Sequence, residues 1–86
     1  MDDPNRRRHI FGEPRHNLAP LVRQYGSEES AGEAIQNAVD AAFEDGDLVL
    51  DDDGLFKQAF DIGGTFVTVS GRVIDGTVHV ATAWIP

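Results

Sequence analysis

The sequence has 86 residues, enough for a single domain, and its hydrophobic fraction of 41% is typical of a chain that folds around a core. The absence of cysteine excludes disulfides and thiolate chemistry, and no apolar run approaches the roughly 20 residues of a membrane span. The formal net charge of −8 argues against broad, non-specific binding of nucleic acid.

The charge is unevenly distributed. The first 25 residues hold five arginines and three acids, whereas the rest of the chain holds two cations and twelve acids. This asymmetry leaves room for a local cationic pocket. Acidic residues that only keep a small domain in solution would produce the same overall balance.

Residues 1–15 are expected to form an irregular basic segment, because Pro4, Gly12 and Pro14 interrupt any periodicity. The arginine run at 6–8 is not followed by an apolar stretch, so it does not indicate a secretory signal. If the chain is a domain of a longer parent protein, its localisation is decided elsewhere in that parent.

Residues 16–45 are expected to be helical. The first helix would run from about 17 to 25 with Asn17 as its cap, and the second from 28 to 44 with Ser27 as its cap. Gly26 would end the first helix. The apolar positions follow helical spacing, with Leu18, Leu21, Val22 and Tyr25 in the first helix and Ala31, Ala34, Ile35, Ala38, Val39, Ala42 and Phe43 in the second.

Residues 48–86 are expected to form an antiparallel sheet. Strands are predicted at 55–62, 65–74 and 77–85, with a further short edge strand at 48–50. Gly63-Gly64 and Asp75-Gly76 supply the positive φ angles of two-residue hairpin turns. The sequence therefore predicts one α+β domain over 1–86, with two N-terminal helices packed on a β-meander of three to four strands.

Two-residue hairpins fix the register and therefore the faces of the sheet. Uninterrupted alternation pairs Val69 with Thr82 and gives an apolar face made of Phe56, Phe60, Val67, Val69, Val73, Val78, Val80, Thr82 and Trp84. The opposite face carries Lys57, Thr68, Ser70, Arg72 and His79. Arg72 lies directly opposite His79 there, a pairing typical of a solvated surface. A β-bulge near Gly71 would instead turn Thr82 to the other face.

Two histidines lie among the N-terminal arginines. His9 follows the arginine run, and His16 follows Arg15 where a helix is expected to begin. An imidazole transfers protons near neutral pH, while arginines and a helix N-terminus stabilise phosphate. These are the groups that metal-free RNA cleavage requires, although both histidines also suit polar surface or capping positions. Their spacing is no metal-ligand signature, so no metal and no cofactor are expected.

Several short motifs between His9 and Trp84 resemble one set of polymorphic toxin tips, the C-terminal domains of contact-dependent growth-inhibition and RHS-type proteins. The motifs are His9-Ile10-Phe11, His16-Asn17-Leu18 with Leu21-Val22, Tyr25-Gly26-Ser27, and Val73-Ile74-Asp75-Gly76 with Ala81-Thr82-Ala83-Trp84. The resemblance implies a barnase/EndoU/colicin/RelE-like nuclease that cleaves RNA, often tRNA, without a metal. It also implies a cognate immunity protein and delivery as the tip of a larger secreted or cell-surface protein, with action in the cytoplasm of the target cell.

The resemblance assigns roles to individual residues. It implies that His9, His16 and Thr82 are catalytic and that Trp84 supports the substrate. Phosphate binding is expected from Arg8 and Arg15, with Lys57 and Arg72 on the sheet as secondary candidates. The acidic net charge departs from the pattern of such toxins, which are usually basic. Two alternatives remain, an acidic immunity- or antitoxin-like binding protein whose acidic half mimics nucleic acid, and a β-augmentation module without a pocket.

Overall fold

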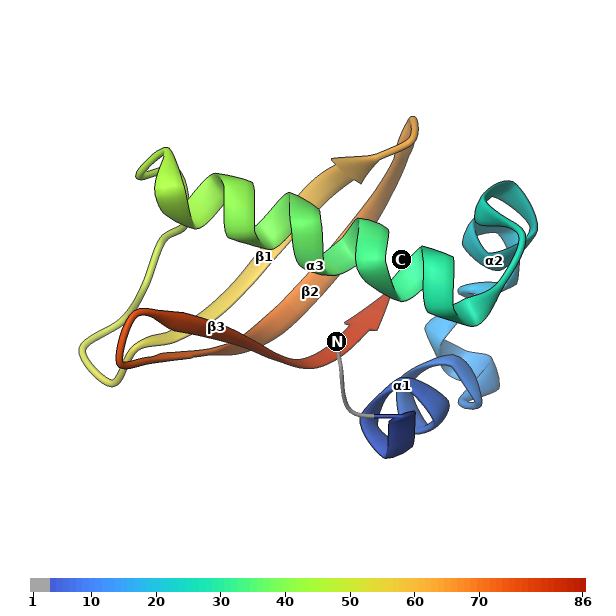
Figure 1. The fold of residues 1–86 in the computed structure, drawn as a ribbon, viewed down its shortest axis with the longest axis horizontal. Coiled ribbons are helices and arrows are strands. Elements are labelled where there is room, and N and C mark those ends of the chain that lie inside the picture. Colours follow the sequence, from blue (N-terminus) through green and yellow to red (C-terminus); the bar gives the residue numbers. More distant parts are fainter. Residues whose placement is uncertain (1–3) are drawn as a thin grey trace.

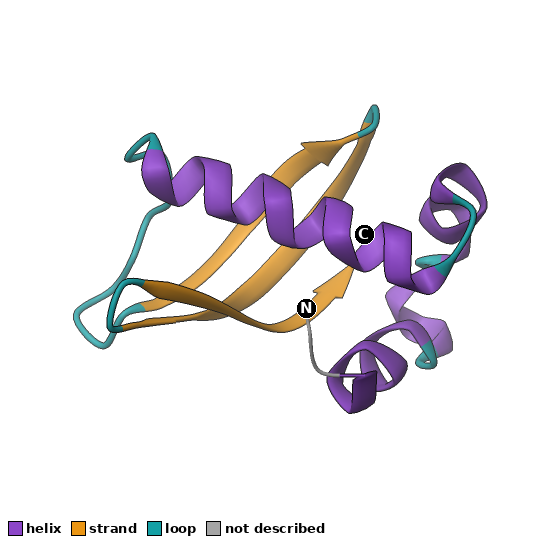
Figure 2. Cartoon of the chain, viewed as in Figure 1, coloured by secondary structure: helices purple, strands orange, loops and turns teal. Residues whose placement is uncertain are grey.

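The computed structural model describes residues 4–86 and has the expected α+β architecture, with N-terminal helices packed on a three-stranded antiparallel meander of order β1-β2-β3 (Figure 1). The elements are α1 (Pro4–Phe11), the 3-10 turn η1 (Pro14–His16), α2 (Ala19–Tyr25), α3 (Glu28–Glu44), β1 (Leu55–Ile62), β2 (Thr65–Ile74) and β3 (Thr77–Trp84). Figure 2 shows α3 lying across one face of the sheet. No helix in the described part of the chain is both long and apolar enough to cross a membrane.

The N-terminal segment is ordered as a helix and a turn, so the expectation of an irregular stretch over residues 1–15 was wrong over its described residues from 4 onward. Pro4 and Gly12, which suggested an irregular chain, instead mark the two ends of a helix. Pro4 begins α1, where a missing backbone N–H costs no hydrogen bond, and Gly12 follows its end and donates to the Arg8 carbonyl at 2.8 Å. Ile10 is fully buried and anchors α1 to the core.

Helix α2 begins two residues later than expected, and Asn17 does not cap it. Asn17 adopts a left-handed conformation with φ 56° and closes η1, while Leu18 is the N-cap residue of α2 and makes no side-chain cap. The predicted stop at Gly26 is confirmed, with φ 90° and an N–H bond to the Val22 carbonyl. Near the C-terminal end of α2, the side-chain amide of Gln24 donates to the Gly63 carbonyl at 2.7 Å and so connects this helix to the first hairpin.

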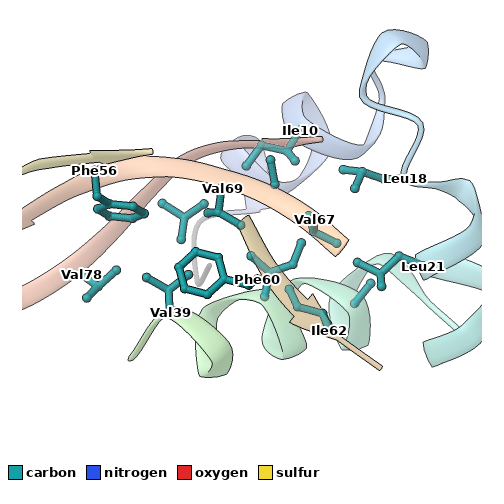
Figure 3. Close-up of a cluster of buried hydrophobic side chains, with 14 of the residues drawn as sticks. Ile10, Leu18, Leu21, Val39, Phe56, Phe60, Ile62, Val67, Val69 and Val78 are labelled. Atoms are coloured by element: carbon teal, nitrogen blue, oxygen red, sulfur yellow. The ribbon is translucent and has the colours of Figure 1, made fainter. Parts of the chain in front are cut away.

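Helix α3 spans the predicted range, and its N-cap is the predicted one. The Ser27 hydroxyl accepts from the backbone N–H of Ser30 at 3.0 Å. Its buried residues face the inner side of the sheet, and Figure 3 shows Val39 and Phe60 within this core, with Ile10, Leu18 and Leu21 continuing it toward the N-terminal helices. The largest fully buried side chains are Ile10, Leu21, Ile35, Val39, Val67 and Val69.

The expected edge strand at 48–50 is not formed. Leu48 is buried, but Val49 is 76% exposed and its backbone N–H bonds the side chain of Gln58 at 3.1 Å rather than a strand. The amide of Gln58 in turn donates to the Asp47 carbonyl at 3.2 Å. One glutamine side chain therefore ties this loop to β1 where a backbone ladder was expected.

Both predicted hairpins are present, but the register of the second changes along its length. Near the turn, Val73 pairs with Val78 as expected. Farther along, Gly71 pairs with Val80 and Ser70 with Thr82, so Ala81 is an extra residue on β3. The prediction of uninterrupted alternation, under which Val69 would pair with Thr82, was therefore wrong. The structure instead has the alternative, a bulge near Gly71.

The bulge exchanges the faces of the last residues of β3. Ala83 is fully buried in the core, whereas Thr82 and Trp84 pair with Ser70 and Thr68 on the outer face and are half-buried. Their expected place on the apolar face was therefore wrong. The close approach of strands at this point also explains Gly71, because a Cβ there would collide with the His79 carbonyl oxygen and with the Phe56 ring.

Candidate functional site

The outer face of the sheet carries the polar groups of the second half of the chain. The helices pack on the inner face, and over residues 4–86 the outer side chains are exposed or half-buried. Three cross-strand rows share this face, namely Leu55–Arg72–His79, Lys57–Ser70–Thr82 and Ala59–Thr68–Trp84. Two cations, one imidazole and three hydroxyls thus lie on one surface.

Two aromatic rings accompany these polar groups. Trp84 is half-buried, and the Lys57 ammonium lies 5.3 Å from the centroid of its ring, within cation–π range. Phe66, on the same face, is 65% exposed. Exposed rings beside cations are the features with which proteins hold unpaired nucleotides, since bases stack and phosphates are neutralised.

A hollow of about 440 Å³ occupies this face at the bulge. It is lined by Arg6, Leu55, Phe56, Ser70, Gly71, Arg72, His79, Val80 and Ala81. Its lining includes the outer-face residues Leu55, Ser70, Arg72 and His79 and no residue of α3. Arg6 reaches it from α1 and donates to the Ala81 carbonyl at 3.3 Å. The sequence placed His79 opposite Arg72 on this face but interpreted the pair as solvated surface. It did not single out Arg6, because only the fold brings α1 to the bulge.

His16 lies where η1 meets both α1 and the end of β3. Its Nδ1 is 2.7 Å from the Ile10 carbonyl oxygen, and its own carbonyl accepts the Ile85 N–H at 2.8 Å. Asn17 adds a bond from its amide to the Ile85 carbonyl at 3.2 Å. When Nδ1 donates its proton to Ile10, Nε2 keeps a lone pair that can accept a proton.

The other N-terminal candidates are more exposed. His9 lies in the last turn of α1, the turn that also supplies the carbonyl bound by His16. Its side chain and that of Arg8 are exposed, and within the described residues neither takes part in a hydrogen bond or ion pair. The fold thus brings His16 to the turn that holds His9.

Arg15 is engaged with Glu13. Its guanidinium lies 3.4 Å from the Glu13 carboxylate while its own side chain is 90% exposed. The backbone N–H of Arg15 is the main cause that lowers the pKa of Glu13 below its ordinary value, and the guanidinium adds to the effect. The carboxylate caps η1 and offsets part of the positive charge expected there.

The sequence candidates therefore fall into two neighbouring groups. Lys57, Arg72, Thr82 and Trp84 share the outer face of the sheet, whereas Arg8, His9, Arg15 and His16 lie on α1 and η1. The two groups meet where Ile85 bonds His16 and Arg6 bonds Ala81. No hydrogen bond joins His9, His16 and Thr82 to one another within the described residues.

Among residues 4–86, no cluster of three or more histidine, cysteine or acidic side chains has a geometry that could hold a metal ion. In comparisons with known proteins, no family model matches the chain, and no curated protein or solved structure matches it. Any functional assignment must therefore come from the chemistry of the site itself.

Proposed function

We propose that this domain is a metal-independent ribonuclease that uses the outer face of its sheet to hold RNA. The observation that carries the proposal is the gathering of Lys57, Arg72 and Trp84, with hydroxyls and an imidazole, on a face that ends at the turn holding His16. The turn that carries His16 is thereby bonded to Ile85, the residue that follows Trp84.

The acidic net charge does not oppose this binding. Charges more than about 8 Å apart are largely screened at physiological salt. Most of the acids lie elsewhere, on α3 and in the loop and turn that follow it, and Asp61 is the only acid on the strand positions of the outer face. A phosphate at this face is therefore expected to interact more strongly with the cations on the face than with the carboxylates that lie elsewhere.

The proposed reaction is an internal transfer at phosphorus. A base removes the proton of the ribose 2′-hydroxyl, the 2′-oxygen forms a bond to phosphorus, and the bond to the 5′-oxygen breaks as an acid protonates it. The products are a 2′,3′-cyclic phosphate and a 5′-hydroxyl end. His16, which is oriented by the Ile10 carbonyl, is suited to the role of the base, and His9 to that of the acid. An arginine would stabilise the negative charge of the five-coordinate phosphate in the transition state.

A second candidate is an acidic protein that binds another protein by mimicking nucleic acid, favoured by the net charge of −8. Such a protein would need no proton-transfer groups and would leave RNA intact. Cleavage of RNA therefore separates the two functions.

The test is cleavage of total RNA by the wild type and by His16→Ala and His9→Ala variants. Each variant is expected to be slower by about 10²–10⁴-fold, the usual contribution of a general acid or base. EDTA is expected to leave the rate unchanged. Arg23→Gln, on the exposed side of α2, is the matched control and should cleave normally. Circular dichroism would verify that each variant is folded.

The proposal fails if both histidine variants cleave as fast as the wild type, or if EDTA abolishes cleavage. Absence of cleavage by the wild type on total RNA and on tRNA would favour the acidic binding protein instead.

A further inference from the structure

The hollow at the β-bulge has the composition of an anion site. Its lining includes two guanidinium groups, one imidazole and one hydroxyl, and it includes no acid. The charge of the lining is therefore positive, although the chain as a whole has a net charge of −8. Arginine offers paired N–H donors that match phosphate oxygens, and its charge persists at any physiological pH.

The bulge creates this arrangement. Ala81 has no partner on β2, and its carbonyl accepts a hydrogen bond from the Arg6 guanidinium, which brings the arginine of α1 to the bulge. On the other side of the hollow, Arg72 lies directly across from His79 on the neighbouring strand. The two arginines and the imidazole thus come from three separate elements, α1, β2 and β3.

One carboxylate near the rim of the hollow, that of Asp51, is engaged in its own turn. Asp51 precedes the rim residue Leu55, and its side chain accepts the backbone N–H groups of Asp53 and Leu55, both at 2.9 Å. One of its two carboxylate oxygens, Oδ1, thereby closes the turn. Leu55 itself is 40% exposed and gives the rim an apolar side.

We propose that this hollow binds the phosphate of a nucleotide unit, with Arg6, Arg72 and His79 as the phosphate contacts. Ser70 contributes a hydroxyl, and the ribose and base lie toward Leu55. The volume of about 440 Å³ is within the range of small-ligand pockets and exceeds what a bare phosphate needs. Placing RNA there rests on the proposed function, whereas phosphate recognition depends only on the lining residues.

The test is an NMR titration of the full chain with uridine 3′-monophosphate, inorganic phosphate and uridine in separate arms, at constant ionic strength. The monophosphate is expected to shift the His79 ring signals and the amides of Ser70, Gly71 and Ala81. Inorganic phosphate should shift the same signals more weakly, and uridine should shift few. Arg6→Gln and Arg72→Gln should each weaken binding of the monophosphate by about tenfold or more, as expected for lost charged hydrogen bonds.

Arg23→Gln is the matched control, an exposed arginine on α2 whose loss should leave the affinity unchanged. Because Arg6 and Arg72 are exposed, their variants are expected to fold, and the amide spectrum verifies this. Equal affinity in Arg72→Gln and the wild type, or shifts that map to α1 and η1 but not to the bulge, would overturn the proposal.

The binding assay also separates this inference from the proposed function. Binding at the bulge without RNA cleavage would support the hollow and contradict the ribonuclease. Cleavage that persists unchanged when Arg6 and Arg72 are both replaced, together with unaltered binding, would leave the ribonuclease standing and reject the hollow.

Discussion

At the residue scale, Ala81 decides what the end of β3 presents to solvent. Without this extra residue, Thr82 and Trp84 would point into the core and Ala83 would point out. With this extra residue, the small side chain of Ala83 fills the buried inner position, while the hydroxyl of Thr82 and the indole of Trp84 lie on the outer face. The bulge also supplies the carbonyl that holds Arg6.

This assignment of faces can be tested with two adjacent substitutions. Ala83→Asp places a carboxylate in a site that is fully buried and is expected to lower the free energy of unfolding by at least about 3 kcal/mol. Thr82→Asp, on the half-exposed outer face, is expected to cost less than about 1 kcal/mol. Urea unfolding of both variants and the wild type measures the difference. Equal losses, or a larger loss at Thr82, would contradict the bulged register.

At the element scale, the parts with strong local chemistry could be predicted from the sequence. The two glycine-containing turns fixed both hairpins, and Ser27 and Gly26 marked helix boundaries, because each acts on its own backbone neighbours. Helix α1 was missed because Pro4 also suits irregular chain and because the burial of Ile10 that stabilises the helix comes from distant parts of the fold.

The candidate site was less predictable for the same reason. A bulge has no unique sequence signature, so the sequence left open the face on which Thr82 lies. The contact of Arg6 with Ala81 spans 75 positions and depends on how α1 packs, which no local pattern records. The place of Lys57 and Arg72 on the outer face could be predicted, because strand alternation and hairpin register are sufficient to determine it.

At the scale of the whole molecule, the cationic groups and the acidic ones occupy different surfaces. Arginines lie on α1 and η1, and Arg6 of α1 reaches the bulge at Ala81. In contrast, α3 begins with Glu28 and Glu29 and ends at Glu44. A protein that silences this domain would therefore be acidic where it covers the N-terminal region, and it would leave much of α3 free.

If the domain is a ribonuclease, the cell that makes it needs such a cognate immunity protein. A stable complex buries about 1,200–2,000 Å² in total, about half of it on each partner. That half is roughly a tenth to a fifth of the 5242 Å² surface of this domain. Co-expression with any small protein encoded next to the domain tests this: a cognate partner should relieve toxicity, and pull-down should recover a complex that weakens as salt rises. Full viability of cells that express the domain alone, together with no co-purification, would count against this partner.

The bonds that join Ile85 to His16 and Asn17 also have a consequence for the order of folding. The Asn17–Ile85 pair is 68 positions apart in the chain, and the His16–Ile85 pair is one position farther, whereas each hairpin joins strands that are consecutive in the chain. We therefore expect these long-range bonds, with their larger cost in loop-closure entropy, to form only after the sheet. The Ile85 amide should exchange its hydrogen for deuterium faster than that of Val69, and equal protection would contradict this order. The domain would then pass through a state with a formed sheet and no assembled site. If the domain is the proposed ribonuclease, mild urea would abolish RNA cleavage before it unfolds the sheet.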